Sequence, residues 1–466
     1  MQDIENVQYD ASYYDSWSYK HKMYNGDSLY QAFIKSRKGS AFKSSVKKFR
    51  LHRLTNIARL RQKLLLHEYQ FHDMSNNIIN ERGKIRLVCG EVIEDRIVEH
   101  IICDEILNPI MFKYLIYDNG ASQPNKGTDF ARRRLEHHLH KYYRQYKTNE
   151  GWILLIDFSK YYDNIWHETI RNMFSDKLFL NPCYDDVMLL INNILDRSKI
   201  DVSWLSNEDI YDLYYDTLDY LKFYLETDMT YQTGIKFLNK HICLGNQVGQ
   251  TAGVSYRIPI DNYIKIVKGE KFYGAYNDDA YIISESKEHL EELFDDILLI
   301  TKSVGITVNL KKTKIVKLSS RWRYLQIQYC LTDTGKVLHK INPKRLYSMR
   351  RKLRKLIYKM TEKEFLDYYK SWFNSYKRYL SRRQRQNLDS LLIELLNIKK
   401  KEVTYSMAIA KKCDACKEFY DFNNDEQEAN GVVLVFFNAQ GQQSHTIDRA
   451  ELCPDCLKKV RDIIKP

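Results

Sequence analysis

Gly274–Ser284, GAYNDDAYIIS, is the stretch that decides the fold. Asp278 and Asp279 stand between Tyr276 and the apolar run 280–283. Aromatic and β-branched residues favour strands, so the stretch predicts a β-hairpin with both carboxylates at its tip. Two carboxylates between apolar strands are costly unless a cation compensates them. The alternative is an Asx turn without further function, since Asp is common in hairpin turns.

A second acidic segment, Gly151–Ile165 (GWILLIDFSKYYDNI), favours the functional interpretation. Its apolar run Trp152–Ile156 is typical of a strand buried on both faces, and the run ends at Asp157. If that strand neighbours the hairpin, Asp157 stands beside the acidic tip. Three carboxylates there suit two Mg²⁺ ions held roughly 3.5–4 Å apart, which activate an attacking 3′-oxygen and stabilise a leaving pyrophosphate.

These two segments resemble motifs of reverse transcriptases. Asp157–Asp163 (DFSKYYD) is similar to the first palm motif of that family, and Tyr276–Asp279 (YNDD) to its Tyr-x-Asp-Asp box. The resemblance spans about Arg82 to Asn342, with the elements in the family's order. It implies an α+β right-hand polymerase with fingers, a palm built on an antiparallel sheet, and a helical thumb.

The resemblance also implies roles for individual residues. The catalytic carboxylates that hold two Mg²⁺ ions would be Asp157, Asp278 and Asp279, with Phe158 as a further metal and substrate contact. Tyr162 stands where the family carries an aromatic ring that excludes a 2′-hydroxyl, so we expect deoxynucleotide substrates.

Phosphate contacts are expected from basic residues on either side of this palm entry. Lys84 and Arg86 share one face of a predicted fingers strand, where the family holds the incoming triphosphate. Three lysines follow a later strand, and the family's pattern favours Lys314 over Lys311 and Lys312 as the one near the pyrophosphate.

The stretch Leu244–Gly253 (LGNQVGQTAG) departs from the family's usual pattern. Gly245 matches the family's glycine, Gly249 stands where Ser is usual, and Gln250 stands where Pro is usual. Leu244 replaces the Gln that braces the nascent base pair, which predicts lowered fidelity or unusual template use. We expect Leu244, Gly245 and Gln250 near the substrate. The pattern is closer to bacterial reverse transcriptases of diversity-generating retroelements and of the abortive-infection or unknown groups.

The charge balance favours a polyanionic partner. The formal net charge is +13, the isoelectric point is about 9.0, and 36 tyrosines are interleaved with the basic residues. Backbone contacts to nucleic acid are expected at a glycine loop that opens a basic helix and along the thumb, at Lys126, Arg132, Arg133, Arg350, Arg351 and Arg354. The alternative is a set of solvated basic helices with half-buried tyrosines.

Four domains are expected from these patterns. They are an N-terminal helical extension (1–80), fingers and palm (81–342) with a helical insertion around 176–240, a helical thumb (343–402) and a zinc ribbon (403–466). The ribbon rests on two CxxC pairs, Cys413, Cys416, Cys453 and Cys456, whose thiolates suit one structural Zn²⁺. The other five cysteines are scattered, which is compatible with a reducing compartment.

The resulting hypothesis is an RNA-directed DNA polymerase that acts in antiphage defence or in a diversity-generating retroelement. Its partners would be a template RNA (a dedicated non-coding RNA is one source), the DNA product, dNTPs, and an accessory protein or a second copy. Template-independent or protein-primed DNA synthesis and an inactive RNA-binding scaffold are the alternatives. The polar start and the lack of a ~20-residue apolar run predict an intracellular protein with no membrane partner. The resemblance implies that it is cytoplasmic and bacterial or phage-encoded.

Overall fold

The computed structural model divides the chain into two compact units, Met1–His339 and Lys340–Pro466. It describes residues 22–81, 84–204, 206, 208, 227–230, 235–243, 245–408, 411–412, 419–420, 431–437 and 443–451. Within these ranges only the backbone is described for 76–87, 200, 227–236 and 400–451. None of the described helices is both long and apolar enough to cross a membrane.

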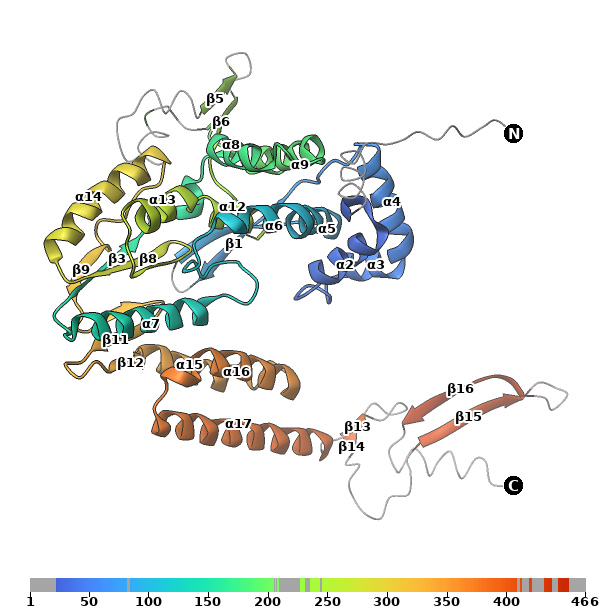
Figure 1. The fold of residues 1–466 in the computed structure, drawn as a ribbon. Coiled ribbons are helices and arrows are strands. Elements are labelled where there is room, and N and C mark those ends of the chain that lie inside the picture. The colour runs from blue at the N-terminus through green and yellow to red at the C-terminus, as the bar shows by residue number, and fades with distance from the viewer. Residues whose placement is uncertain are drawn as a thin grey trace, which may run out of the picture. The chain divides into compact units, whose positions relative to one another are not determined.

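The first unit begins with helices that pack against α5 (Ile93–Ile102; Figure 1). They are α2 (Gly26–Ser36), α3 (Ser44–Leu51) and α4 (Arg53–Leu65). The buried positions of α4, Ile57, Leu60 and Leu64, recur at helical spacing, and its exposed face is basic. The antiparallel pair β1 (Ser75–Glu81) and β2 (Lys84–Gly90) follows, and then α5. The helices and the strand pair lie where the sequence predicts them, while their assignment to an N-terminal extension and to fingers stays a prediction.

A four-stranded antiparallel sheet forms the centre of this unit, in the order β7-β8-β3-β9. Its strands are β7 (Tyr273–Tyr276), β8 (Asp279–Ser284), β3 (Trp152–Asp157) and β9 (Lys314–Lys317). The apolar interior of β3 is buried, as the sequence predicts for a central strand. β7 and β8 form the predicted hairpin, and only Asn277 and Asp278 lie between them.

Helices cover both faces of this sheet. Figure 1 shows α13 (Ile258–Asn262) and α14 (Lys287–Ser303) on one side and α7 (Thr128–Tyr146) on the other. Ala280 and Ile282 of β8 join one core with the buried leucines of α14. The alternate residue Tyr281 points to the other face, where its hydroxyl bonds His138 of α7 at 3.0 Å. The two-residue period of the strand thus separates the two layers.

The segment predicted as an insertion belongs partly to the core. It contains the last turn of α8 (His167–Leu178), then α9 (Tyr184–Arg197) and a small sheet of β4 (Ile200–Asp201), β6 (Ile235–Leu238) and β5 (Thr227–Thr230). One face of α9 is buried in the main core through Val187, Ile191 and Ile194. The expected insertion is helical at α9, which packs on the main core, and most of 205–226 lies outside the described residues, so the insertion itself stays a prediction.

Two further elements complete the surroundings of the site. The helix α12 (Gln247–Ser255) lies beside α5 (Figure 1). A three-stranded sheet follows α14 and contains β10 (Trp322–Tyr324), β11 (Ile327–Leu331) and β12 (Val337–Ile341). Shorter helical segments are η1 (Cys103–Leu107), α6 (Asn108–Met111), η2 (Phe112–Tyr114), η3 (Tyr161–Asn164) and η4 (Tyr263–Val267).

The second unit contains the three predicted thumb helices, α15 (Pro343–Leu356), α16 (Glu362–Tyr376) and α17 (Arg382–Ala408), with η5 (Lys377–Tyr379) between the last two. Leu353, Phe365 and Leu391 share a small core of their own. A capping box of Thr361 and Glu364 begins α16. The strands β13 (Lys411–Lys412) and β14 (Phe419–Tyr420) form one pair. The strands β15 (Gly431–Phe437) and β16 (Gln443–Glu451) form another, where strands were predicted between the two CxxC motifs.

Candidate active site

Asp157 lies directly opposite Asp279 in the antiparallel pairing of β3 with β8. The backbone N–H of Phe158 donates to the carbonyl of Asp278 at 3.1 Å, so the end of β3 is bonded to the turn of the hairpin. Asp278 is exposed in that turn and Asp279 is half-buried. The structure therefore brings together the two distant acidic segments that the sequence singled out.

The charges at this tip are poorly compensated. Burial, followed by the charges of Asp278 and Asp157, raises the pKa of Asp279 to about 7. Lys312 forms an ion pair with Asp157, with its Nζ 2.8 Å from Oδ2 and 3.1 Å from Oδ1. In the described part of the chain no hydrogen bond or ion pair reaches the carboxylates of Asp278 and Asp279. Lys312 is thus the one described side chain that forms an ion pair with a carboxylate of this tip.

A cavity of about 340 Å³ adjoins the tip. Asp157 and Asp279 line it together with the basic side chains Lys311, Lys312, Lys314 and Arg323. Lys314 begins β9, while Lys312 is the lysine that contacts a carboxylate. The structure thus places all three candidate lysines at the cavity and brings Lys312 nearest to the acidic tip.

The donor set of the tip fits Mg²⁺, which prefers carboxylate oxygens and needs few protein ligands. The raised pKa of Asp279 shows negative charge that the protein does not neutralise. Within the described residues, no three His, Cys, Asp or Glu side chains converge on one metal position. Asp157 is instead engaged by Lys312, so a cation would compete with that lysine.

Arg257 was not singled out by the sequence, yet it binds the turn that carries the acidic tip. It is fully buried, and its guanidinium donates to the carbonyl of Asn277 in the turn and to Asp261 Oδ1 at 3.1 Å. Its cationic group also lies 5.1 Å from the centre of the Phe158 ring. Its charge lowers the pKa of Asp279, against the larger effect of burial. A single Arg after α12 gives no sequence signal for this role.

Tyr162 lies against α12. A Cβ at Gly253 would come 2.6 Å from Cε1 of Tyr162, so the ring rests where only glycine leaves room. Burial and the charges of Asp278 and Tyr276 raise the pKa of Tyr162 to about 12. The neighbouring Tyr161 donates its hydroxyl to the carbonyl of Gly253 at 2.6 Å. The predicted sugar-contacting ring therefore lies between the acidic tip and α12.

The departure at Gly249, in the first turn of α12, has a structural reason. Asn246 caps the helix by accepting from the N–H of Gly249 at 2.6 Å, and a Cβ at Gly249 would lie 2.3 Å from that oxygen. A serine, usual in the family, has no room there. Gly245 has φ 126°, and a Cβ would lie 2.9 Å from the carbonyl oxygen of Cys89. Gln250 is exposed.

Three predicted substrate contacts are not described. Leu244 lies outside the described residues, and only the backbone of β2 is described at Lys84 and Arg86. The ligand set Cys413, Cys416, Cys453 and Cys456 also lies outside them. The roles expected of these residues stay predictions.

The glycine loop before α7 reaches the hairpin. Thr128, the first residue of α7, donates its hydroxyl to Tyr276 at 3.2 Å. Lys126 is half-buried and donates to the carbonyls of Tyr117 and Asn119, at 2.9 and 3.1 Å. The structure places this loop beside the active-site tip, as the resemblance implies.

The predicted nucleic-acid contacts differ in exposure. Arg132 is buried and donates to the carbonyl of Leu325 at 2.7 Å, so the expectation that it contacts a nucleic-acid backbone is contradicted. It faces inward because its helical position points to the β10–β11 turn. Arg133 is exposed and pairs with Asp129. On α15, Arg351 and Arg354 are exposed and Arg350 is half-buried.

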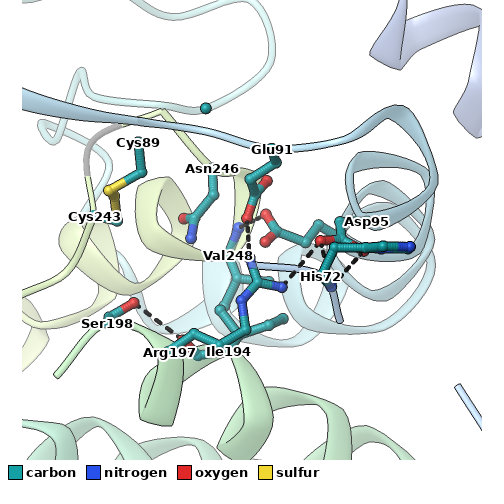
Figure 2. Close-up of polar contacts among 12 residues, drawn as sticks. His72, Cys89, Glu91, Asp95, Ile194, Arg197, Ser198, Cys243, Asn246 and Val248 are labelled. Atoms are coloured by element: carbon teal, nitrogen blue, oxygen red, sulfur yellow. Dashed lines mark hydrogen bonds and ion pairs between the residues drawn. A yellow bond between two sulfur atoms is a disulfide. The ribbon is translucent and has the colours of Figure 1, made fainter. Parts of the chain in front are cut away.

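A second cluster of carboxylates lies where α5, α9 and α12 meet (Figure 2). Arg197 of α9 donates to Glu91 Oε1 at 3.0 Å and to Asp95 Oδ2 at 3.2 Å. Asp95 also accepts from the hydroxyl of Tyr69 at 2.6 Å and from the N–H of His72 at 3.1 Å. We call Glu91, Asp95 and Glu99 the junction carboxylates. They have no shared sequence motif that would have revealed them.

A disulfide between Cys89 and Cys243 lies next to this junction (Figure 2). The two residues are 154 positions apart, and their Cα atoms are 6.0 Å apart. Two of the cysteines that look scattered in the sequence therefore face each other, and they connect the end of β2 to the segment before α12.

The antiparallel sheet thus joins Asp157 to the hairpin of Asp278 and Asp279. The family model described as "Reverse transcriptase (RNA-dependent DNA polymerase)" matches residues 224–329. The matched region holds α12, the Asp278–Asp279 tip and α14, and it does not include Asp157. The chain thus contains a region similar to that family. No curated protein matches the sequence.

Solved structures of yeast telomerase are distantly similar. Telomerase from Candida tropicalis in complex with a TWJ fragment of telomeric RNA shares 11% identity at a TM-score of 0.41, over 76% of this chain and 58% of its own. The corresponding Candida albicans structure shares 11% at 0.38, over 71% and 59%. Apo telomerase from Candida tropicalis shares 12% at 0.36, over 57% and 48%. The chain spans about half to three-fifths of these telomerase chains, and a likeness this low carries no argument about function.

Proposed function

We propose that this chain is an RNA-directed DNA polymerase that extends a primer with deoxynucleotides. The observation that carries the proposal is the pairing of Asp157 with Asp279 at the tip of an antiparallel sheet. The reverse transcriptase model matched at 224–329 supports it, because that region holds the other half of the acidic site.

Each residue near the tip has a task in this proposal. Asp157, Asp278 and Asp279 would hold two Mg²⁺ ions, with Phe158 beside them; when bound, these ions activate the primer 3′-hydroxyl and neutralise the pyrophosphate. Lys312 and Lys314 supply positive charge that stabilises the phosphate oxygens of the leaving pyrophosphate. Tyr162 limits the space at the sugar, Arg257 holds the turn that carries the two aspartates, and Lys84 and Arg86 would bind the triphosphate.

The biological setting extends this proposal. We place the enzyme in the cytoplasm of a bacterium or a phage-infected cell, in antiphage defence or a diversity-generating retroelement, with a template RNA and an accessory protein or a second copy. The motif at Leu244–Gly253 supports such a setting. The exposed arginines of α15 would contact the template–primer duplex, and the four tail cysteines would bind one structural Zn²⁺.

Primer extension with Mg²⁺, dNTPs and an RNA template tests the function, with the Asp278→Ala/Asp279→Ala double variant as control. We expect template-dependent DNA synthesis by the wild type alone. Equal synthesis without template would instead support template-independent or protein-primed polymerisation. RNA binding with no synthesis by the wild type would leave an RNA-binding scaffold and end the proposal.

A further inference from the structure

Glu99 is buried at the junction of α5 and α12, where the proposed chemistry gives it no role. We infer that Glu99 is a positioning residue that fixes α12, and through α12 the ring of Tyr162, for nucleotide binding. The link to nucleotide rests on the proposed function, whereas the link to α12 stands without it.

The first step is the bond between Glu99 and the start of α12. Glu99 Oε2 accepts from the backbone N–H of Gln247 at 2.7 Å and of Val248 at 3.3 Å. The first amides of a helix have no partner within the helix, and here their surroundings are largely buried. Asn246 takes the next free amide, that of Gly249. Glu99 and Asn246 thus hold the first turn of α12 from two sides.

The second step is what holds Glu99 itself. Glu91 is bound by Arg197, while its second oxygen, Oε2, is buried. Neither that oxygen nor Glu99 Oε1 has a hydrogen-bond partner within the described residues. Burial and the adjacent Glu91 carboxyl raise the pKa of Glu99 well above its ordinary value. Both carboxyl groups offer only acceptors when ionised, whereas a protonated Glu99 lies within hydrogen-bonding reach of Glu91, which Arg197 already anchors.

The third step runs along α12 to the active site. The carbonyl of Gly253 accepts from Tyr161, and Tyr162 rests on the Cα of Gly253 at a distance that excludes any side chain there. A shift of α12 must therefore displace the Tyr162 ring or break the bond to Tyr161. The position of α12, set at its N-terminus by Glu99, determines where that ring lies beside the acidic tip.

The test compares Glu99→Gln with Glu99→Ala. Glutamine keeps an oxygen for the α12 amides and gains an N–H₂ that donates to Glu91 without a titratable proton. We expect Glu99→Gln to keep the dNTP KM within about twofold of wild type, and Glu99→Ala to raise it about tenfold or more with a smaller change in kcat. Glu94→Ala, which removes a half-buried carboxylate from the first turn of the same helix, is the matched control and should leave KM unchanged.

Hydrogen exchange of the amides at 247–255 supplies a readout that does not depend on activity. We expect faster exchange in Glu99→Ala and wild-type rates in Glu99→Gln. An unchanged KM in a folded Glu99→Ala variant overturns the link to the nucleotide, and unchanged exchange overturns the link to α12. If Glu99→Ala does not fold, Glu99→Asp keeps the carboxyl group with a shorter reach and takes its place. Absence of synthesis by the wild type counts against the proposed function, while the exchange result still decides the contact with α12.

Discussion

Two clusters of three carboxylates lie in the described part of the chain, and they differ in what surrounds them. At the junction, Arg197, a tyrosine hydroxyl and backbone amides bind Glu91, Asp95 and Glu99. At the tip, Asp157, Asp278 and Asp279 have one lysine among the described side chains. At the junction the protein itself provides hydrogen-bond donors to carboxylates that stabilise the fold. At the tip the negative charge is left for a bound cation to neutralise.

The clusters also differ in how they are connected. The tip is built on two paired strands of a rigid sheet, and its like charges oppose one another. The junction connects three helices, and each of its bonds crosses from one helix or strand end to another. Removing charge should therefore cost function at the tip and stability at the junction.

The largest effect is expected at the tip. Asp278→Ala/Asp279→Ala should lower primer extension by at least about 1000-fold, because the metal ligands are lost. The same variant should unfold at an equal or higher temperature, since two mutually repelling carboxylates are removed. Single-turnover extension and thermal unfolding measure the two effects, and a strongly destabilised variant would contradict the comparison.

The second effect concerns Arg197. Arg197→Met leaves Glu91 and Asp95 buried beside an uncharged side chain, which should lower the free energy of unfolding by about 3–5 kcal/mol. Arg171→Met is the matched control, because its partner Asp196 is half exposed, and it should cost less than about 1 kcal/mol. Urea unfolding compares the two variants. Equal losses in the free energy of unfolding would show that the ion pairs of the junction stabilise the fold no more than an exposed pair does.

The third effect is the pH dependence of metal stabilisation. Asp279 has a pKa of about 7 in the folded protein and 3.8 ordinarily, so the folded state binds its proton more tightly. Its contribution to stability without metal is present below about pH 4 and is lost as the pH rises through about 7. A bound cation competes with that proton, so Mg²⁺ should raise the unfolding temperature more at pH 8 than at pH 6. Asp279→Asn should remove the difference; a difference that persists would place the titration elsewhere.

The smallest effect is expected at Lys312, whose side chain is 52% exposed. Lys312→Met should change the unfolding temperature little, because exposed ion pairs contribute little to stability. It should tighten Mg²⁺ binding to the resting protein a few-fold, since the lysine no longer competes for Asp157. Calorimetric titration of Mg²⁺ measures this, with Lys311→Met as the matched control; weaker binding would mean that Lys312 supports the site rather than competes for it.

Much of the tip could be predicted from the sequence because its signals are local. An apolar run that ends in Asp157, and an Asp pair between two strand-forming runs, identify both strands and the turn. The register between β3 and β8 was the one part of this prediction that depended on residues distant in the sequence. Few pairings of the two strands are compatible with so short a hairpin. The thumb helices were likewise visible from helical spacing.

The junction could not be predicted, because its members are ordinary residues of their own elements. Glu99 and Arg197 look like solvated charges on α5 and α9, and Cys89 and Cys243 look unrelated. The expected role of Arg132 failed for the same reason, since a basic helix does not show which arginine points inward.

The amino-acid sequence by itself determined which segments form the central strands, where the acidic groups stand along them, and that the surface is basic. Only the tertiary structure decided which charges are satisfied by the protein and which are left open. Local pattern specifies the direction of a side chain relative to its own helix or strand, whereas the partner of a buried charge depends on how separate elements pack.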